Sequence, residues 1–229
     1  DVYKRQTMNI GYYDTDKQFD YENGFYLTSE PYRIGNILAH YELYKKIINL
    51  PGDVIELGVF KGSSFIQFCT FRELLENEKS RKIIGFDMFG TFPETKKLKS
   101  DIDFVNNWNT TFANEFLEKE DIEKALSKKG YSNYELVQGN ILDTLDDYLN
   151  RNPHTKISLL HIDTDVYEPA KYALEKLFDK VVKGGVIVFD DYATIEGETK
   201  AIDEFFRDSN YILKKFTFSH TKPSYIIKE

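Results

Sequence analysis

Residues 157–165, ISLLHIDTD, decide the fold of this 229-residue chain. Six mostly apolar residues lead directly into Asp163 and Asp165. A short, nearly unbroken apolar run is typical of a strand that is covered on both faces, as strands of parallel sheets are. A second run of this kind, VIVF at 186–189, leads into Asp190 and Asp191. The pattern therefore predicts two buried parallel strands with acidic residues at their carboxyl ends.

Similar apolar runs alternate with helical patterns along the rest of the chain. Further strands are expected at 54–59, 83–86 and 134–137, and helices at 63–78, 141–150, 167–182 and 197–207. An apolar stripe predicts another helix within 30–50, capped by Ser29 and stopped by Pro51-Gly52. Two β-rich runs, 211–218 and 224–227, suit an antiparallel pair at a sheet edge, and 93–130 is a polar insertion that ends in a helix. We therefore expect a doubly wound α/β fold. Its sheet would be mostly parallel and seven-stranded, with helices on both faces and a ligand at the carboxyl ends of the strands.

Composition and charge exclude several classes of protein. Thirty Lys and Arg against 38 Asp and Glu leave a net charge of −8, which repels nucleic acid. No run approaches the roughly 18 apolar residues of a membrane span, and a signal peptide is not expected. Cys69 is the single cysteine, so neither an internal disulfide nor a thiolate zinc site is expected. We expect a soluble, cytoplasmic protein whose binding site is lined by some of its 16 Tyr and 18 Phe residues.

The first expected strand runs into a glycine-containing turn, IELGVFKGSS at 55–64. Gly58 and Gly62 allow a tight turn and the close approach of a ligand, and Ser63-Ser64 open the next helix. The alternative is a strand-to-helix turn without a ligand, in which the glycines are needed only for the backbone geometry. The dinucleotide motif G-x-G-x-x-G is absent, which disfavours an NAD oxidoreductase. Glu56, an acid at the strand end, suits the cationic amino group of an amino-acid-bearing cofactor.

Polar residues also follow the second and third expected strands. Asp87 is placed to accept hydrogen bonds from a ribose diol, although a helix cap or a loop-turn aspartate is the alternative. Gly139-Asn140 either borders an adenine ring or forms a plain turn.

The strongest group is the four aspartates that follow the fourth and fifth strands. If those strands are neighbours, Asp163, Asp165, Asp190 and Asp191 converge, and bare like charges would raise one another's pKa values. Mg²⁺ accepts carboxylate oxygens and would resolve the repulsion. Asp165 has the alternative of capping the helix that follows it. His161 is expected to be a core histidine satisfied by a partner, and no pair of histidines has ligand spacing.

Four blocks together resemble the TylF/macrocin O-methyltransferase family of class I S-adenosylmethionine-dependent methyltransferases. They are PGDVIELGVFKGSS, FDMFGTFPE, LLHIDTDVYEPAKYALEKLF and VKGGVIVFDDYATIEGETKAIDEFF, which run from residue 51 to about 206. Phe60 replaces the middle glycine of the motif E-x-G-x-G-x-G and resembles the aromatic residue that this family carries there. The resemblance implies a Rossmann-like methyltransferase fold, Mg²⁺, and methylation of hydroxyls on sugars or sugar-containing natural products.

The resemblance assigns cofactor-binding residues by position. It implies that Glu56, Gly58 and Gly62 hold the methionine portion of S-adenosylmethionine, and that Asp87 binds its ribose hydroxyls. The full expected set is Glu56, Gly58, Phe60, Lys61, Gly62, Ser63, Ser64, Asp87, Met88, Gly139 and Asn140.

The resemblance likewise assigns the reacting groups. Asp163, Asp190 and Asp191 match the metal ligands of the family. Asp165 matches a second acid of the same block and is the candidate general base, with Asp163 as the contender. Because a sugar hydroxyl is a poor nucleophile at neutral pH, both a cation and a base are expected to assist its in-line attack on the methyl group.

The expected organisation is a single domain overall. Residues 1–7, ahead of Met8, are expected to be a non-native prefix, 8–50 an N-terminal lid and helix, and 51–229 the catalytic domain. The aromatic stretch 12–26 and the insertion 93–120 are expected to form the lid and the substrate wall. The acceptor is expected to be a small molecule, a sugar or glycosylated metabolite, with a glycan building block or a catechol-like phenol as alternatives. The resemblance also implies a homodimer, and neither nucleic acid nor membrane is expected as a partner.

The main alternative function is a metal-dependent nucleotide-sugar glycosyltransferase that uses Asp163 and Asp165 as its D-x-D motif. This alternative leaves Glu56, Gly58 and Asp87 without a role. A haloacid-dehalogenase-type phosphatase would need a Ser/Thr strand and a Lys between the two acidic motifs, where the sequence has no room for them. A non-catalytic protein on the same fold is disfavoured by the acids that remain at every family position.

Overall fold

Seven strands form one sheet at the centre of the computed structural model, which describes residues 8–113, 115–219 and 221–229. The expected prefix 1–7 lies outside the described residues. The spatial order of the strands is β5 (Tyr134–Gln138), β4 (Ile83–Asp87), β3 (Asp53–Leu57), β6 (Ile157–Ile162), β7 (Val181–Phe189), β9 (Ser224–Ile227) and β8 (Lys214–Lys215). The first five are parallel, and β9 pairs antiparallel with both β7 and β8. This confirms the doubly wound, mostly parallel sheet, including the expected neighbours β6 and β7.

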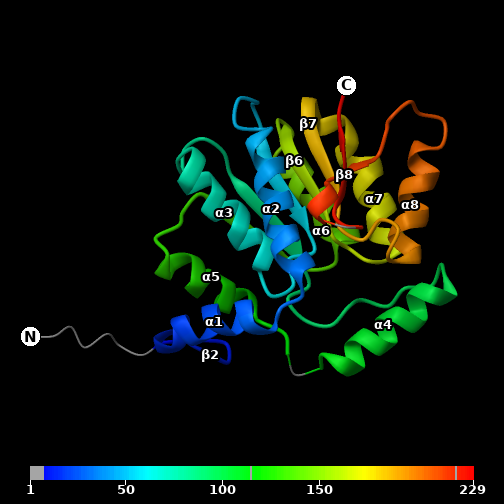
Figure 1. Cartoon of the computed structure of the whole chain (residues 1–229). Coiled ribbons are helices and arrows are strands. Elements are labelled where there is room, and N and C mark those ends of the chain that lie inside the picture. The colour runs from blue at the N-terminus through cyan, green and yellow to red at the C-terminus, as the bar shows by residue number, and fades with distance from the viewer. Residues whose placement is uncertain (1–7, 114, 220) are drawn as a thin grey trace, which may run out of the picture.

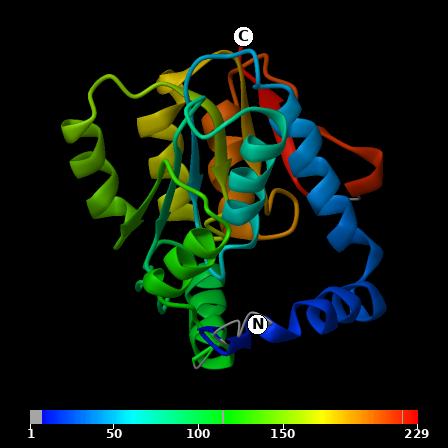
Figure 2. The same ribbon diagram turned by 90° about the vertical axis from the view of Figure 1, so that its left-hand side faces the viewer.

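Helices cover both faces of the sheet because its strands are apolar on both sides (Figure 2). One face, with Ile55 and Leu160, packs against α6 (Ile141–Arg151), α7 (Tyr167–Leu177) and α8 (Glu196–Phe206). The other face, with Val54 and Leu159, packs against α2 (Pro31–Lys45), α3 (Ser63–Leu75) and α5 (Lys119–Lys128). Adjacent residues of a strand therefore point to different helical layers.

The carboxyl ends of the parallel strands are covered by two further helices, α1 (Gln18–Thr28) and α4 (Lys99–Thr111), which lie below the sheet in Figure 1. A two-stranded sheet of β1 (Asn9–Ile10) and β2 (Tyr13–Asp14) precedes α1, and α5 contacts β1. Three short 3₁₀ turns complete the described elements: η1 (Thr15–Lys17), η2 (Phe178–Lys180) and η3 (Thr217–Ser219). From β3 the chain adds β4 and β5 on one side of the sheet and then β6 and β7 on the other side. Doubly wound sheets bind ligands at such a change of side, next to the carboxyl ends of the strands.

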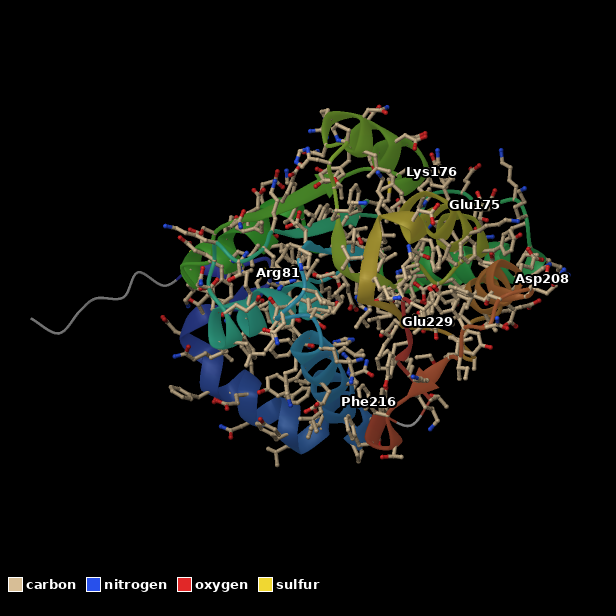
Figure 3. The ribbon with its side chains drawn as sticks, turned by 90° about the horizontal axis from the view of Figure 1, so that it is seen from above. Arg81, Glu175, Lys176, Asp208, Phe216 and Glu229 are labelled. Carbon is tan, nitrogen blue, oxygen red and sulfur yellow. The ribbon has the colours of Figure 1, made fainter. Side chains whose placement is uncertain are left out.

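The opposite end of the sheet is fastened by a buried arginine. Arg81, labelled in Figure 3, is 5% exposed and donates hydrogen bonds to the carbonyl groups of Ile47 and Gly52 at 3.0 Å. It also donates to Ser158 Oγ at 2.5 Å and pairs with Glu76 at 2.7 Å. One guanidinium thus joins the end of the α2 segment to the amino ends of β3 and β6.

Several expected boundaries were wrong. The helix expected to be capped by Ser29 begins at Pro31 with Glu30 as N-cap, because Ser29 closes α1 and a proline suits the first helical position. It ends at Lys45, before the expected stop at Pro51-Gly52. The strand expected at 54–59 ends at Leu57, since the backbone turns at Gly58. The helix expected at 63–78 ends at Leu75, and the run expected at 211–218 forms only the two-residue β8.

Two of these differences change the elements next to the acidic residues. The helix expected at 167–182 ends at Leu177, because Val181 already pairs with Ile157 and extends β7 back to that point. Asp165 does not cap α7: the N-cap is Val166, without a side-chain hydrogen bond, and Asp165 itself has a left-handed φ of 60°. Within the described residues, no helix combines the length and apolarity needed to cross a membrane.

Candidate functional site

A cavity of about 900 Å³ lies at the carboxyl ends of the parallel strands. This volume is at the upper end of ordinary ligand pockets, so a cofactor-sized molecule and an acceptor have room together. Nine of the expected cofactor residues line it: Gly58, Phe60, Lys61, Ser63, Ser64, Asp87, Met88, Gly139 and Asn140. All four aspartates, Asp163, Asp165, Asp190 and Asp191, line it as well. The lid segment adds Tyr13 and Phe25, and the insertion adds Phe104, Trp108 and Phe116.

The turn after β3 brings the backbone of two strand ends into contact. Gly58 has a φ of 95°, and a Cβ there would lie 1.8 Å from the carbonyl oxygen of Asp163. Gly62, with a φ of 81°, is the N-cap of α3 and makes no side-chain cap hydrogen bond. Ser63 and Ser64, the first residues of α3, line the cavity, and the first backbone N–H groups of a helix bind a carboxylate group favourably. This turn fits the amino-acid portion of a cofactor.

Asp87 organises the turns after β3 and β4. Its carboxylate accepts hydrogen bonds from the backbone N–H groups of Val59, Phe60 and Phe89, at 2.7, 2.8 and 2.6 Å. Burial raises the pKa of the Asp87 carboxyl above its ordinary value, against the opposing effect of these hydrogen bonds. Asn140 lines the same part of the cavity and caps α6 through its side chain. Asp87, expected to bind the ribose, and Asn140, expected beside the adenine ring, thus both line the cavity. Each side chain also accepts hydrogen bonds from backbone N–H groups of the protein.

Two expected cofactor residues, Glu56 and Gly62, are not part of the cavity wall. Glu56 is fully buried, and its Oε1 lies 2.9 Å from Nδ1 of His161. The alternation of side chains along β3 explains this, because Glu56 points with Val54 toward the layer of α2 and α3. His161 accordingly has the expected buried partner on one ring nitrogen.

Three of the four aspartates form one group. Asp163, Asp165 and Asp191 each bring a carboxylate oxygen to within 4.8 Å of the others. Burial and the negative charges of the neighbouring aspartates raise the pKa values of Asp163 and Asp165 well above their ordinary range. A group of this kind favours a cation, and carboxylate oxygens are the ligands that Mg²⁺ prefers. The residues present therefore fit Mg²⁺.

The fourth aspartate stands between this group and two histidines. Asp190 Oδ1 lies 3.7 Å from Nε2 of His161 and 3.9 Å from Nε2 of His40. Its Oδ2 lies 3.7 Å from Nζ of Lys222, which also pairs with Asp191 at 2.8 Å. Burial alone would raise the pKa of Asp190, but His161, with His40 and Lys222, lowers it below the ordinary range. Three of the four acids that were expected to converge therefore form one group, and the fourth, Asp190, lies beside two histidines and a lysine.

Glu198 is a site residue that sequence reasoning missed. It is fully buried at the start of α8 and accepts hydrogen bonds from the backbone N–H groups of Thr164, Asp165 and Asp191, at 3.1, 3.2 and 3.1 Å. One side chain thus joins the loop after β6 to the loop after β7. Burial and the charge of Asp191 raise the pKa of Glu198 to about 8. An acid in a first helical turn is ordinarily an exposed one, so the sequence offered no signal.

His40 and Lys222 were missed for different reasons. His40 lies within the buried stripe of α2, beside Ala39 and Leu43, and a polar residue in an apolar stripe is a signal that could have been used. Lys222 precedes β9, far from the acids in the chain, and its position depends on the antiparallel return of that strand.

Aromatic side chains of α4 and of the turn after β3 form part of the cavity wall. The ring of Trp108 on α4 lies 5.3 Å from Phe60, 5.7 Å from Phe104 and 4.4 Å from Phe112. Its Nε1 is buried without a hydrogen-bond partner among the described residues. Phe60, in place of the motif glycine, therefore packs against the insertion, and the wall offers flat apolar surface to a ligand.

Comparisons with known proteins give the same family as the motifs. The profile of the macrocin-O-methyltransferase (TylF) family matches residues 39–218. The demethyldecarbamoylnovobiocin O-methyltransferase of Streptomyces niveus is 26% identical over 170 residues, which cover 69% of this chain and 59% of that protein. The 8-demethyl-8-(2,3-dimethoxy-alpha-L-rhamnosyl)-tetracenomycin-C 4'-O-methyltransferase of Streptomyces olivaceus is 25% identical over 150 residues, or 63% of this chain and 54% of that protein. The chain spans between half and three fifths of the length of these relatives.

Solved structures share the fold. The calicheamicin methyltransferase CalS11 has a TM-score of 0.69 at 23% identity, covering 93% of this chain and 85% of that chain. The O-methyltransferase NovP has a TM-score of 0.73 at 21% identity, covering 86% of this chain and 79% of that chain. At these identities the likeness establishes the Rossmann-like methyltransferase fold. Because the family profile spans most of the sequence, the chain belongs to the TylF macrocin-O-methyltransferase family.

Proposed function

We propose that this protein is an S-adenosylmethionine- and Mg²⁺-dependent O-methyltransferase that methylates a hydroxyl of a sugar or a sugar-containing metabolite. One observation carries the proposal: the acidic group of Asp163, Asp165 and Asp191 lines the same cavity as the Gly58 turn and Asp87. Membership of the family supports O-methylation, and so do two relatives named as O-methyltransferases. The name of one of these relatives includes a rhamnosyl group, which supports a sugar-containing acceptor.

The residues of the turn after β3 are proposed to bind the methionine portion of the cofactor. The N-terminus of α3 at Ser63 and Ser64 would receive its carboxylate, because the helix dipole and free backbone N–H groups favour an anion. Asp87 would accept from the ribose hydroxyls, and Gly139-Asn140 would border the adenine ring. When bound, the cofactor supplies a methyl group on a sulfonium centre, open to in-line attack by an oxygen nucleophile.

The aspartates are proposed to hold the cation and move the proton. Asp163 and Asp191 of the acidic group, together with the adjoining Asp190, would bind Mg²⁺, which when bound would supply positive charge that lowers the pKa of a nearby hydroxyl. Asp165 would accept the hydroxyl proton, with Asp163 as the alternative base. A carboxylate whose pKa is raised by burial and by its neighbours accepts a proton more readily than an exposed one. Closure of the cavity by α1 and α4 would exclude water from the reacting groups.

The alternative D-x-D glycosyltransferase is disfavoured by the family match and by the cavity wall. A sugar nucleotide leaves the Gly58 turn and Asp87 without a function, whereas both line the cavity beside the acids. Thermal unfolding with S-adenosylhomocysteine or NADH, each with Mg²⁺ and with chelator, separates the candidates. S-Adenosylhomocysteine at 100 times its dissociation constant should stabilise by about 2.7 kcal/mol. A shift with metal alone, and none with S-adenosylhomocysteine, would discard the methyltransferase.

A second experiment tests whether Asp190 is needed for turnover but not for binding of the cofactor. Asp190→Ala should abolish turnover and leave the affinity for S-adenosylhomocysteine largely intact, because Asp190 lines the cavity as a proposed Mg²⁺ ligand and is not one of the proposed cofactor-binding residues. Asp208→Ala is the matched control, since Asp208 is exposed at the outer edge of the molecule (Figure 3). Loss of cofactor affinity in Asp190→Ala alone would overturn the metal assignment.

The proposal includes a homodimer. Exposed apolar side chains on α1, with Phe19 67% and Leu27 84% exposed, support an interface there. Light scattering of the purified chain measures the mass directly, and a monomer at working concentration would contradict this part.

A further inference from the structure

A buried carboxylate of α4 takes the place of a side-chain cap at the start of α7. Asp101 lies in the first turn of α4 and is 1% exposed. Its Oδ2 accepts a hydrogen bond at 2.8 Å from the backbone N–H of Tyr167, the first residue of α7. The N-cap of α7, Val166, makes no side-chain hydrogen bond. Because the first N–H groups of a helix have no partner within the helix, Asp101 satisfies one of them from a distant part of the chain.

This contact completes the hydrogen bonds of the loop that carries Asp165. The backbone N–H groups of residues 164–167 all have acceptors. The first two donate to Glu198, at 3.1 and 3.2 Å, and the third donates to the carbonyl oxygen of Thr164 at 2.6 Å. The fourth is the N–H that donates to Asp101. Asp165 has a left-handed φ of 60°, a conformation that persists only where the surroundings fix it, so its position depends on the contacts at both ends of this loop.

Two further contacts attach the insertion to α7 and α8. Gly197 in α8 leaves room for the carboxylate, since a Cβ there would lie 2.7 Å from Oδ2 of Asp101 and 2.7 Å from the backbone nitrogen of Tyr167. Thr95 Oγ1 donates a hydrogen bond to Glu168 Oε2 in the first turn of α7, at 2.8 Å. The insertion is therefore attached to the helices that follow the acidic residues.

The same helix carries aromatic side chains of the cavity wall. Trp108 lies two turns after Asp101, so both side chains are on the same face of α4, and Trp108 lines the cavity. Asn109 closes the insertion on itself, because its side chain accepts from the N–H of Phe92 at 2.8 Å and donates to the carbonyl oxygen of the same residue at 3.1 Å. The contact at Asp101 therefore sets where Trp108 stands relative to the loop 164–167.

We propose that Asp101 is a positioning residue that couples the acceptor wall, the side chains of Phe104 and Trp108 on α4, to the loop of Asp165. The rings that would pack on the acceptor and the carboxylate that would accept its proton then keep a fixed separation. In-line transfer needs this alignment, because a displacement of about 1 Å costs a large part of the rate. The roles of the acceptor wall and of Asp165 rest on the proposed function, whereas the attachment of α4 does not.

The test compares Asp101→Ala with Asp101→Asn and with a matched control, Asp53→Ala. Asparagine keeps an oxygen that can accept from the N–H of Tyr167. Asp53 accepts from the backbone N–H of Lys82 at 2.8 Å at the start of β3, so its loss removes the same kind of hydrogen bond at the opposite end of the sheet. Gly197→Ala displaces the carboxylate without removing it, and keeps the test valid if circular dichroism shows that Asp101→Ala is unfolded.

Two readouts are measured for each variant. Trp108 is the single tryptophan of the chain, so its emission and its quenching by acrylamide report the position of α4. Calorimetric titration with Mg²⁺ reports the acidic group. We expect Asp101→Ala and Gly197→Ala to shift the emission to longer wavelength, to increase the quenching and to weaken Mg²⁺ binding about fivefold, the effect of one typical hydrogen bond. Asp101→Asn and Asp53→Ala should keep both readouts at the wild-type values, although Asp53→Ala lowers the unfolding temperature.

The proposal is overturned if Asp101→Ala behaves like Asp53→Ala, if only one of the two readouts changes, or if Asp101→Asn restores neither. Absence of Mg²⁺ binding to the wild type would instead refute the Mg²⁺ dependence in the proposed function. The emission of Trp108 in the same variants then decides whether Asp101 holds α4 in place.

Discussion

Replacing Gly58 with alanine tests whether the close approach of β3 to β6 holds the site together. The added Cβ would lie 1.8 Å from the carbonyl oxygen and 2.8 Å from the carbonyl carbon of Asp163, so backbone and not a flexible side chain must move. The chain cannot relax freely, because Gly58 N–H donates to Phe86 and Asp163 N–H donates to Leu57, each at 2.9 Å. The variant is therefore strained in its backbone and overpacked at once.

The magnitude follows from these two effects. A non-glycine residue at a φ of 95° costs about 1–3 kcal/mol, and overpacking costs about 1–3 kcal/mol. With some loss of the adjoining hydrogen bonds, we expect Gly58→Ala to lower the free energy of unfolding by about 3–6 kcal/mol. For a chain of this size the unfolding temperature should fall by about 10–20 °C. That is a large share of the 5–15 kcal/mol by which folded proteins are typically stable.

Thermal unfolding of Gly58→Ala beside Gly24→Ala makes the comparison. Gly24 lies in α1 with open space within 4 Å of an added Cβ, so the same substitution there should leave stability unchanged or raise it by up to about 1 kcal/mol. Addition of S-adenosylhomocysteine should stabilise Gly24→Ala and the wild type but not Gly58→Ala. An unfolding temperature for Gly58→Ala within 2 °C or so of the wild type would refute the steric reasoning.

Three further predictions concern the acidic group. Glu198→Ala should weaken Mg²⁺ binding about tenfold, because the backbone N–H groups of Thr164, Asp165 and Asp191 lose their common acceptor; an unchanged calorimetric affinity would count against the role of Glu198. Lys222→Met should strengthen Mg²⁺ binding about tenfold, since it removes an ammonium group 2.8 Å from Asp191, and weaker binding would be the contrary result. In chelator, stability should fall as pH rises from about 5 to 8. Asp163, Asp165 and Glu198 have raised pKa values in the folded protein. Across this pH range the folded protein keeps protons that the unfolded chain releases, so the free energy of unfolding falls as pH rises. The stabilisation is present in full only below the pKa values of these groups in the unfolded chain. Mg²⁺ should flatten that dependence in thermal unfolding, and a rise of stability with pH in chelator would contradict it.

Much of the fold follows from local sequence. Each parallel strand is covered on both faces, so it must be written as a nearly continuous apolar run, and ISLLHI and VIVF are visible without a structure. The carboxyl ends of the parallel strands lie at one edge of the sheet. Acids placed directly after the apolar runs therefore meet at that edge, independently of how the helices pack. That is why Asp163, Asp165, Asp190 and Asp191 were predicted to converge, and three of the four, Asp163, Asp165 and Asp191, form one group. Element boundaries were less predictable, since Val181 joins β7 only because Ile157 lies beside it.

The tertiary structure alone decided which partners the acids have. Strand alternation places Glu56 and His161 on one face of the sheet, but only the packing of α2 on that face brings His40 to them. Glu198 reaches the two acidic loops because the start of α8 docks beneath both, and Lys222 reaches Asp191 because β9 returns antiparallel beside β7. The sequence by itself determined the strands and their acidic ends, since burial and side-chain periodicity are local properties. The contacts of His40, Glu198 and Lys222 with the acidic strand ends join segments that are far apart in the chain. These contacts form only when the helices and strands pack in three dimensions.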